Sequence, residues 1–167
     1  MTRTLVLLRH ANAEGWADTD ADRVLAPHGV DAAGMVGTWL REQEIRPDRA
    51  LVSSAARTQQ TWSIVAEHAG WTLVPDVEAG LYTAGPDAAL DLVRLTDESV
   101  ETLLVLGHNP TIHYLAQLLS DGQGEVAVEN EMLTGFAPAT VAVFEIDVTW
   151  DRLSQGYGRL VAVRPGT

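Results

Sequence analysis

Four side chains of this sequence, Arg9, His10, Arg57 and His108, are suited to hold and transfer a phosphoryl group. Such a group carries negative charge on three equatorial oxygens, and a planar guanidinium grips these oxygens two at a time. A neutral imidazole nitrogen can attack phosphorus and form a covalent intermediate, which divides the displacement into two easier steps. His10 fits the role of nucleophile because it lies beside Arg9, while the other two side chains would stabilise the transferring charge.

Each of these residues also has an ordinary explanation when it is taken alone. The Arg9-His10 pair could lie in an exposed turn, Arg57 could cap or salt-bridge its helix, and His108 could be a loop histidine bonded to backbone. Their joint occurrence favours a shared site. The other histidines, His28, His68 and His113, have no such context, and we interpret them as structural or exposed.

The four side chains need strands to bring them together. Short apolar runs at 4–8, 50–52 and 102–106 are typical of strands buried on both faces of a sheet, and we expect 4–8 at its centre. Arg9-His10, Ser53 to Arg57, and His108 each follow one of these strands. Further strands are predicted at 71–74, 140–146 and 158–163, the last two as a hairpin at an edge.

Helical spacing of apolar residues separates these strands. It predicts helices from Gly29 to about Leu40, where glycines suggest close packing on the sheet, and from Thr58 to a stop at Gly70. Segments 86–95 and 112–119 are also expected to be helical, whereas 120–131 is interpreted as a polar loop. We therefore predict an α/β fold: a three-layer open sheet, mostly parallel, with helices on both faces and ligands bound beyond the carboxyl ends of its strands.

Composition limits the classes of protein that this chain can be. Its 167 residues fit one domain, 1–167, and the absence of cysteine excludes disulfides, thiolate zinc sites and thiol catalysis. No apolar run is long enough to cross a membrane, and the net charge of −12 repels nucleic acid and anionic membranes. We expect a cytoplasmic protein that binds neither nucleic acid nor membranes. The sequence does not predict the oligomeric state, and a monomer is the simplest expectation.

Three motifs carry a family resemblance. In order along the chain they are Leu8-Arg9-His10-Ala11, Ser53-Ser54-Ala55-Ala56-Arg57-Thr58-Gln59-Gln60-Thr61 and Gly107-His108-Asn109-Pro110. They resemble the motifs of the histidine phosphatase superfamily, whose fold is that of phosphoglycerate mutase. The short length, the Arg23-Val24-Leu25 segment before Gly29 and the Leu81-Tyr82 segment are similar to the SixA-type phosphohistidine phosphatase branch. Ala11 and Ala26 depart from the commonest form of these motifs without removing a catalytic side chain.

The resemblance implies a phosphatase that uses no metal or organic cofactor. His10 would be the phosphorylated nucleophile, Arg9 and Arg57 would hold phosphate oxygens, and His108 would stabilise the transferring group. The substrate that it implies is phosphohistidine on a protein. A small phosphate ester is an alternative that needs a general acid, for which Glu78 is the candidate by position. A domain that binds a phosphorylated ligand without turnover is a further alternative.

One acidic segment, from Glu14 to Asp22, follows the His10 motif. We interpret it as a solvated loop, with the alternative that it screens out highly charged substrates.

Overall fold

The central strand β1 (Arg3–Arg9) lies inside a six-stranded sheet in the computed structural model, which describes residues 1–167. The strand order is β3-β2-β4-β1-β5-β6, in which neighbours from β3 to β1 run parallel, and β5 runs antiparallel to both β1 and β6. The fold prediction, a mostly parallel open sheet, is confirmed. The other strands are β2 (Arg49–Ser53), β3 (Asp76–Glu78), β4 (Thr102–Gly107), β5 (Val141–Ile146) and β6 (Gly158–Arg164).

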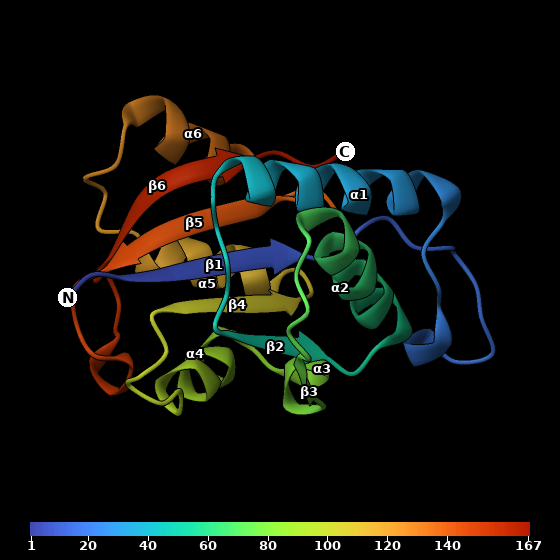
Figure 1. Ribbon diagram of the computed structural model, residues 1–167, viewed down its shortest axis with the longest axis horizontal. Coiled ribbons are helices and arrows are strands. Elements are labelled where there is room, and N and C mark those ends of the chain that lie inside the picture. Colours follow the sequence, from blue (N-terminus) through green and yellow to red (C-terminus); the bar gives the residue numbers. More distant parts are fainter.

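Helices cover both faces of this sheet (Figure 1). One face carries α1 (Pro27–Glu42) and α2 (Ala56–Ala69), and the other carries α4 (Pro86–Arg94), α5 (Thr111–Leu119) and α6 (Val126–Thr134). Shorter helices are α3 (Gly80–Thr83) and the 3₁₀ turns η1 (Asp20–Asp22) and η2 (Trp150–Arg152).

Strand alternation explains why the inner strands are continuously apolar. Leu5 and Leu7 of β1 belong to the core on the α4 and α5 side, whereas Val6 and Leu8 belong to the core under α1 and α2. Successive side chains of a strand point to opposite faces, so a strand between two helical layers must be apolar at every position. All four of these leucine and valine side chains are fully buried.

Gly34 and Gly37 of α1 serve helix–helix packing rather than the expected contact with the sheet. A side chain on Gly37 would place its Cβ 2.4 Å from the carbonyl oxygen of Val65 in α2. The two helices therefore approach through their backbones at this point, which only glycine permits. The expectation of close packing was right, but its partner is α2.

Two element predictions are wrong. Residues 71–74 form no strand: Trp71 packs on Trp62 of α2 with ring centroids 5.7 Å apart, Val74 is 83% exposed, and pairing with β2 begins only at Asp76. The segment 120–131 is not a loop throughout, because α6 begins at Val126. This helix buries only Met132 and so lacks the apolar stripe that would have revealed it.

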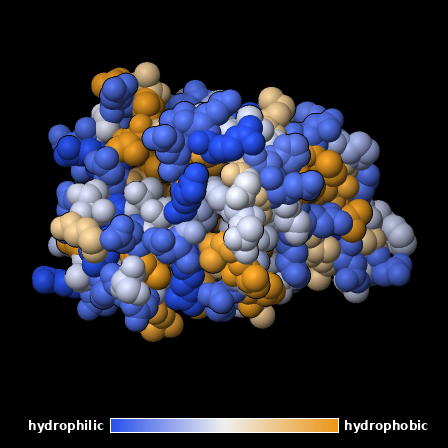
Figure 2. Space-filling model, viewed as in Figure 1, coloured by the Kyte–Doolittle hydropathy of each residue, from blue (hydrophilic) through white to orange (hydrophobic).

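No helix combines the length and the apolar character that crossing a bilayer demands. On the face drawn in Figure 2, hydrophobic residues form separate patches among hydrophilic ones.

Candidate active site

The carboxyl ends of β1, β2 and β4 meet at one edge of the sheet. In the parallel register Arg9 lies opposite Gly107, and Val52 lies opposite Leu106, so the residues that follow these strands emerge side by side. The rings of His10 and His108 have centroids 5.3 Å apart at this edge, which we call the rim of the site. The helices α2 and α5 also begin here, and helix N-termini favour anions.

His10 is buried and held in one orientation. Its Nδ1 lies 2.8 Å from the carbonyl oxygen of Ala11, and because a carbonyl only accepts hydrogen bonds, Nδ1 must carry the proton. In the neutral ring Nε2 then keeps its lone pair. Burial lowers the pKa of His10 to about 4, with a smaller contribution in the same direction from Arg57 and Arg9. The ring is therefore neutral and nucleophilic at Nε2 near pH 7.

His108 is the second neutral histidine of the rim. Its Nε2 is 2.7 Å from the hydroxyl oxygen of Ser53, while its buried Nδ1 has no hydrogen-bond partner. Burial, followed by the charges of His10 and Arg57, lowers the pKa of His108 to about 3. The ring of Tyr82 meets it edge-on with centroids 5.6 Å apart. An arriving dianion would favour the protonated form of this ring and make it a donor.

Arg9 lies at the rim without a carboxylate partner. Its Nη1 donates to the carbonyl oxygen of Phe136 at 2.9 Å, an oxygen that also accepts from Asn109 Nδ2 at 2.8 Å. The Nε of Arg9 is buried and has no partner, and burial lowers the pKa of the guanidinium. A half-buried guanidinium with a free donor is suited to bind an anion.

Arg57, by contrast, contacts an acidic side chain that sequence reasoning missed. Asp20 in η1 accepts from Arg57 through both its main-chain carbonyl, at 2.9 Å, and its carboxylate, at 3.2 Å. Arg23 donates to the same carboxylate at 3.0 Å, and the Tyr82 hydroxyl donates at 2.5 Å. Asp20 is exposed, as expected of a solvated loop, but it also contacts residues of the site. Its contacts join residues 37 and 62 positions apart, which no local sequence pattern signals.

Glu78 does not contact the other site residues through a hydrogen bond or an ion pair. Glu78 ends β3 opposite Ser53 of β2, at the same edge of the sheet, but its half-buried side chain makes no hydrogen bond or ion pair. From the segment after it, Tyr82 reaches the rim and lies under the Arg57 guanidinium, 5.9 Å from ring centroid to Cζ.

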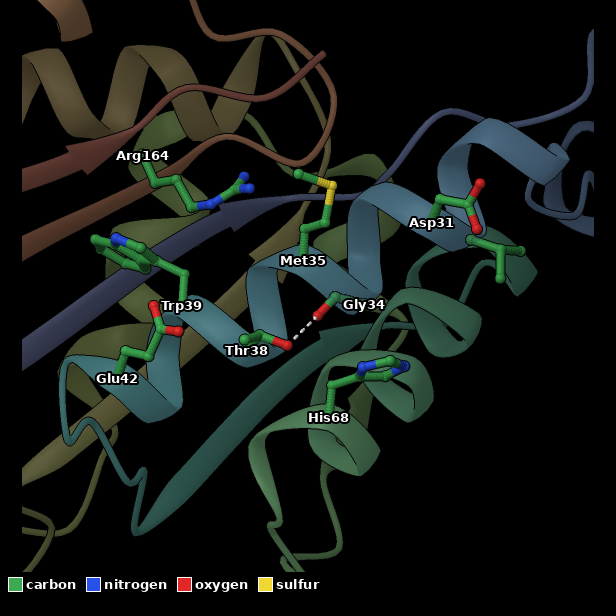
Figure 3. A pocket seen from close by; sticks show the side chains of 9 residues that line it. Asp31, Gly34, Met35, Thr38, Trp39, Glu42, His68 and Arg164 are labelled. Atoms are coloured by element: carbon green, nitrogen blue, oxygen red, sulfur yellow. Dashed lines mark hydrogen bonds between the residues drawn. The ribbon is translucent and has the colours of Figure 1, made fainter.

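The side chains of the remaining histidines make no hydrogen bond or ring contact with His10, His108, Arg9 or Arg57. His113 Nε2 is 2.8 Å from the carbonyl oxygen of Met132, and His28 contacts the C-terminal Thr167. His68 lines a cavity of about 560 Å³ between α1 and α2, together with Met35, Trp39 and Arg164 (Figure 3). This cavity shares no residue with the catalytic candidates. No group of three or more His, Asp or Glu side chains is arranged to hold a metal ion.

Comparison with known proteins places this geometry in a family. The model of the histidine phosphatase superfamily (branch 1) matches residues 5–82. The phosphohistidine phosphatase SixA of Escherichia coli is 30% identical over 119 residues, covering 70% of this chain and 74% of that protein. The chain belongs to the histidine phosphatase superfamily. Within it, the chain is similar to the SixA-type proteins, as its motifs suggested.

Relatives within this superfamily match along nearly the whole chain. An uncharacterised protein of Mycobacterium tuberculosis is 34% identical over 158 residues, 92% of this chain and 96% of its own. A SixA-type protein of Nakamurella multipartitia has a similar structure, with a TM-score of 0.88 and 34% identity over 100% of this chain and 98% of that one. The structure of the protein histidine phosphatase SixA complexed with tungstate is also similar, with a TM-score of 0.75 and 25% identity. The match covers 97% of this chain and 96% of that one.

Proposed function

We propose that this protein is a phosphohistidine phosphatase that works through a phosphorylated His10. The observation that carries the proposal is the state of His10: a buried, neutral ring whose Nδ1 proton is tied to Ala11, which leaves Nε2 free as a nucleophile beside two arginines. The named activity of the SixA relatives supports a phosphohistidine on a protein as the substrate.

The proposed reaction has two steps that use groups of the chain alone. His10 Nε2 forms a bond to phosphorus while the bond from phosphorus to the leaving group breaks, and the bonding electrons stay with the leaving group. Arg9 and Arg57 would bind the equatorial oxygens, and His108 would donate to one of them. Water then attacks phosphorus, and the bond between phosphorus and His10 Nε2 breaks. This step releases inorganic phosphate and restores the neutral ring.

Trapping the intermediate tests the nucleophile. Incubation with phosphoramidate is expected to add one phosphoryl group to the intact protein, and peptide mass spectrometry should place it on His10. His10→Ala is expected to abolish the label and to lower the hydrolysis rate by at least about a thousand-fold, because removal of a catalytic nucleophile has an effect of this size. His28→Ala, which changes an exposed histidine in the first turn of α1, serves as the matched control.

The outcome for the His10 variant decides the proposal. Unchanged hydrolysis by His10→Ala would show that another group is the nucleophile. Binding of phosphate or phosphoramidate without any turnover by the intact protein would instead indicate a phosphorylated-ligand binding domain.

A small-molecule phosphomonoesterase is the second candidate, and the position of Glu78 favours it. β3 brings Glu78 to the edge of the sheet next to Ser53, where an acid could protonate a leaving alkoxide. Glu78→Gln should then slow the hydrolysis of alkyl phosphates far more than that of phosphoramidate. Equal effects on both substrates would remove Glu78 as the acid.

A further inference from the structure

The Asp20 carboxylate lies on the arginine that is proposed to hold phosphate. Its oxygens accept from Arg57, Arg23 and the Tyr82 hydroxyl, and its main-chain carbonyl accepts from Arg57 as well. Neither the phosphoryl-binding roles nor the nucleophile uses this acidic group. A carboxylate this close to a binding site for a dianion repels the substrate, so its presence calls for a compensating function.

Burial shows on which side of the site Asp20 lies. The Arg57 side chain is 8% exposed, whereas the Asp20 side chain that contacts it is 52% exposed. His10 is buried like Arg57, at 8% exposed. The attacking and leaving atoms of a phosphoryl transfer are roughly in line with phosphorus, so the leaving group departs away from His10, toward solvent. Because Asp20 is the exposed partner of the buried Arg57, we infer that its carboxylate lies beside this path.

Asp20 is ionised there and stays so. The hydrogen bond from Tyr82, followed by that from Arg23, lowers the pKa of Asp20 to about 2. An ionised carboxylate has no proton to give, and it accepts hydrogen bonds only. It is therefore unsuited to protonate a leaving alkoxide, but it is suited to receive an N–H group that carries positive charge.

We propose that Asp20 is a specificity-determining residue that accepts a hydrogen bond from the protonated nitrogen leaving group of a phosphoramidate, phosphohistidine above all. The inference rests on the proposed function and extends it to the choice of leaving group. In phosphohistidine, one ring nitrogen bears phosphorus and the other can bear a proton, which makes the ring an imidazolium. The Asp20 carboxylate would stabilise this cation, with its N–H pointing at a carboxylate oxygen.

The step balances without a proton donor. The bond between His10 Nε2 and phosphorus forms, the bond between phosphorus and the substrate nitrogen breaks, and its electron pair stays on that nitrogen. The ring leaves as neutral imidazole and keeps the proton on its other nitrogen. The leaving group of an ester, by contrast, departs as an anion, which the Asp20 carboxylate repels.

A substrate comparison tests this role. The kcat/KM of wild type and of Asp20→Asn is measured with a phosphohistidine peptide and with p-nitrophenyl phosphate, whose leaving group is an anion. We expect Asp20→Asn to lower kcat/KM for the peptide by about 10- to 100-fold, the effect of losing one charge-assisted hydrogen bond. For the ester it should stay unchanged or rise. Asp22→Asn is the matched control, because Asp22 bonds only the Thr19 hydroxyl in the same turn.

The ratio of the two kcat/KM values separates the outcomes. It does not depend on the folded fraction of the variant, so a loss of stability cannot imitate the expected result. Equal losses for both substrates would mean that Asp20 only positions Arg57, and the inference would be wrong while the proposed function stands. If wild type neither hydrolyses the peptide nor takes up phosphate on His10, the proposed function itself fails.

Discussion

Each end of β1 carries an arginine, Arg3 buried and Arg9 half-buried, and the two arginines have different surroundings. At the amino end Arg3 pairs with Glu98 and donates to the carbonyl oxygen of Val148 at 3.1 Å. At the carboxyl end Arg9 has one backbone carbonyl and no carboxylate. Both lie on the same central strand and both have a buried Nε without a partner, but only Arg3 has a carboxylate as its counter-charge.

This difference separates a structural arginine from one that is ready for a ligand. Glu98 also accepts from the main-chain nitrogen of Trp150 at 2.8 Å, so its carboxylate joins β1 to the η2 turn within the fold. Burying a guanidinium without such a partner costs free energy, and the lowered pKa of Arg9 reflects that cost. A bound phosphoryl group would supply the missing negative charge.

The largest expected effect in this comparison is on activity. Arg9→Met should lower kcat/KM for phosphoramidate by about 100- to 1000-fold, the cost of removing one donor to a transition-state oxyanion. Its free energy of unfolding should stay the same or rise, because the variant removes a half-buried charge without breaking an ion pair. Activity assays and urea unfolding on the same sample measure both quantities. A variant that is unstable but fully active would assign Arg9 to the fold.

The reverse pattern is expected at the other end of the strand. Arg3→Met should lower the free energy of unfolding by about 1–3 kcal/mol, since it leaves Glu98 without its partner; the 45% exposure of Glu98 keeps the effect below that of a fully buried pair. The kcat/KM of the folded protein should remain within about two-fold of wild type, as for surface and remote positions in general. A large loss of activity at unchanged stability would contradict the division between the two ends.

Sequence alone predicted the half of the site that comes from strand ends. The runs at 4–8 and 102–106 are buried on both faces, so their composition alone marks them as strands, and parallel strands bring His10 and His108 to one edge. The half that comes from loops was missed. Asp20 and Tyr82 meet through two segments without periodicity, and their contact depends on where η1 and α3 pack. The same applies to β3, whose start at Asp76 is set by pairing with β2.

The smallest of these effects is a loss of stability at acidic pH, caused by the lowered pKa of His10. In the unfolded chain His10 takes up a proton near pH 6.5, whereas in the folded protein burial lowers its pKa to about 4. Between these values the unfolded state binds more protons, so the free energy of unfolding falls as pH is lowered from 6.5 toward 4 and is unaffected by this group above 6.5. By pH 5 the loss should be about 1–2 kcal/mol, at 1.36 kcal/mol per unit of pKa difference.

Two measurements check this prediction. Urea unfolding between pH 7 and pH 4.5 should show a weaker pH dependence in His10→Ala than in wild type. NMR titration should show the His10 ring still neutral at pH 5.5, with its proton on Nδ1, where a solvated histidine is largely charged. Titration of His10 at an ordinary pKa would mean that water reaches the ring. The carboxyl end of β1 would then lack the dry surroundings that keep the nucleophile neutral.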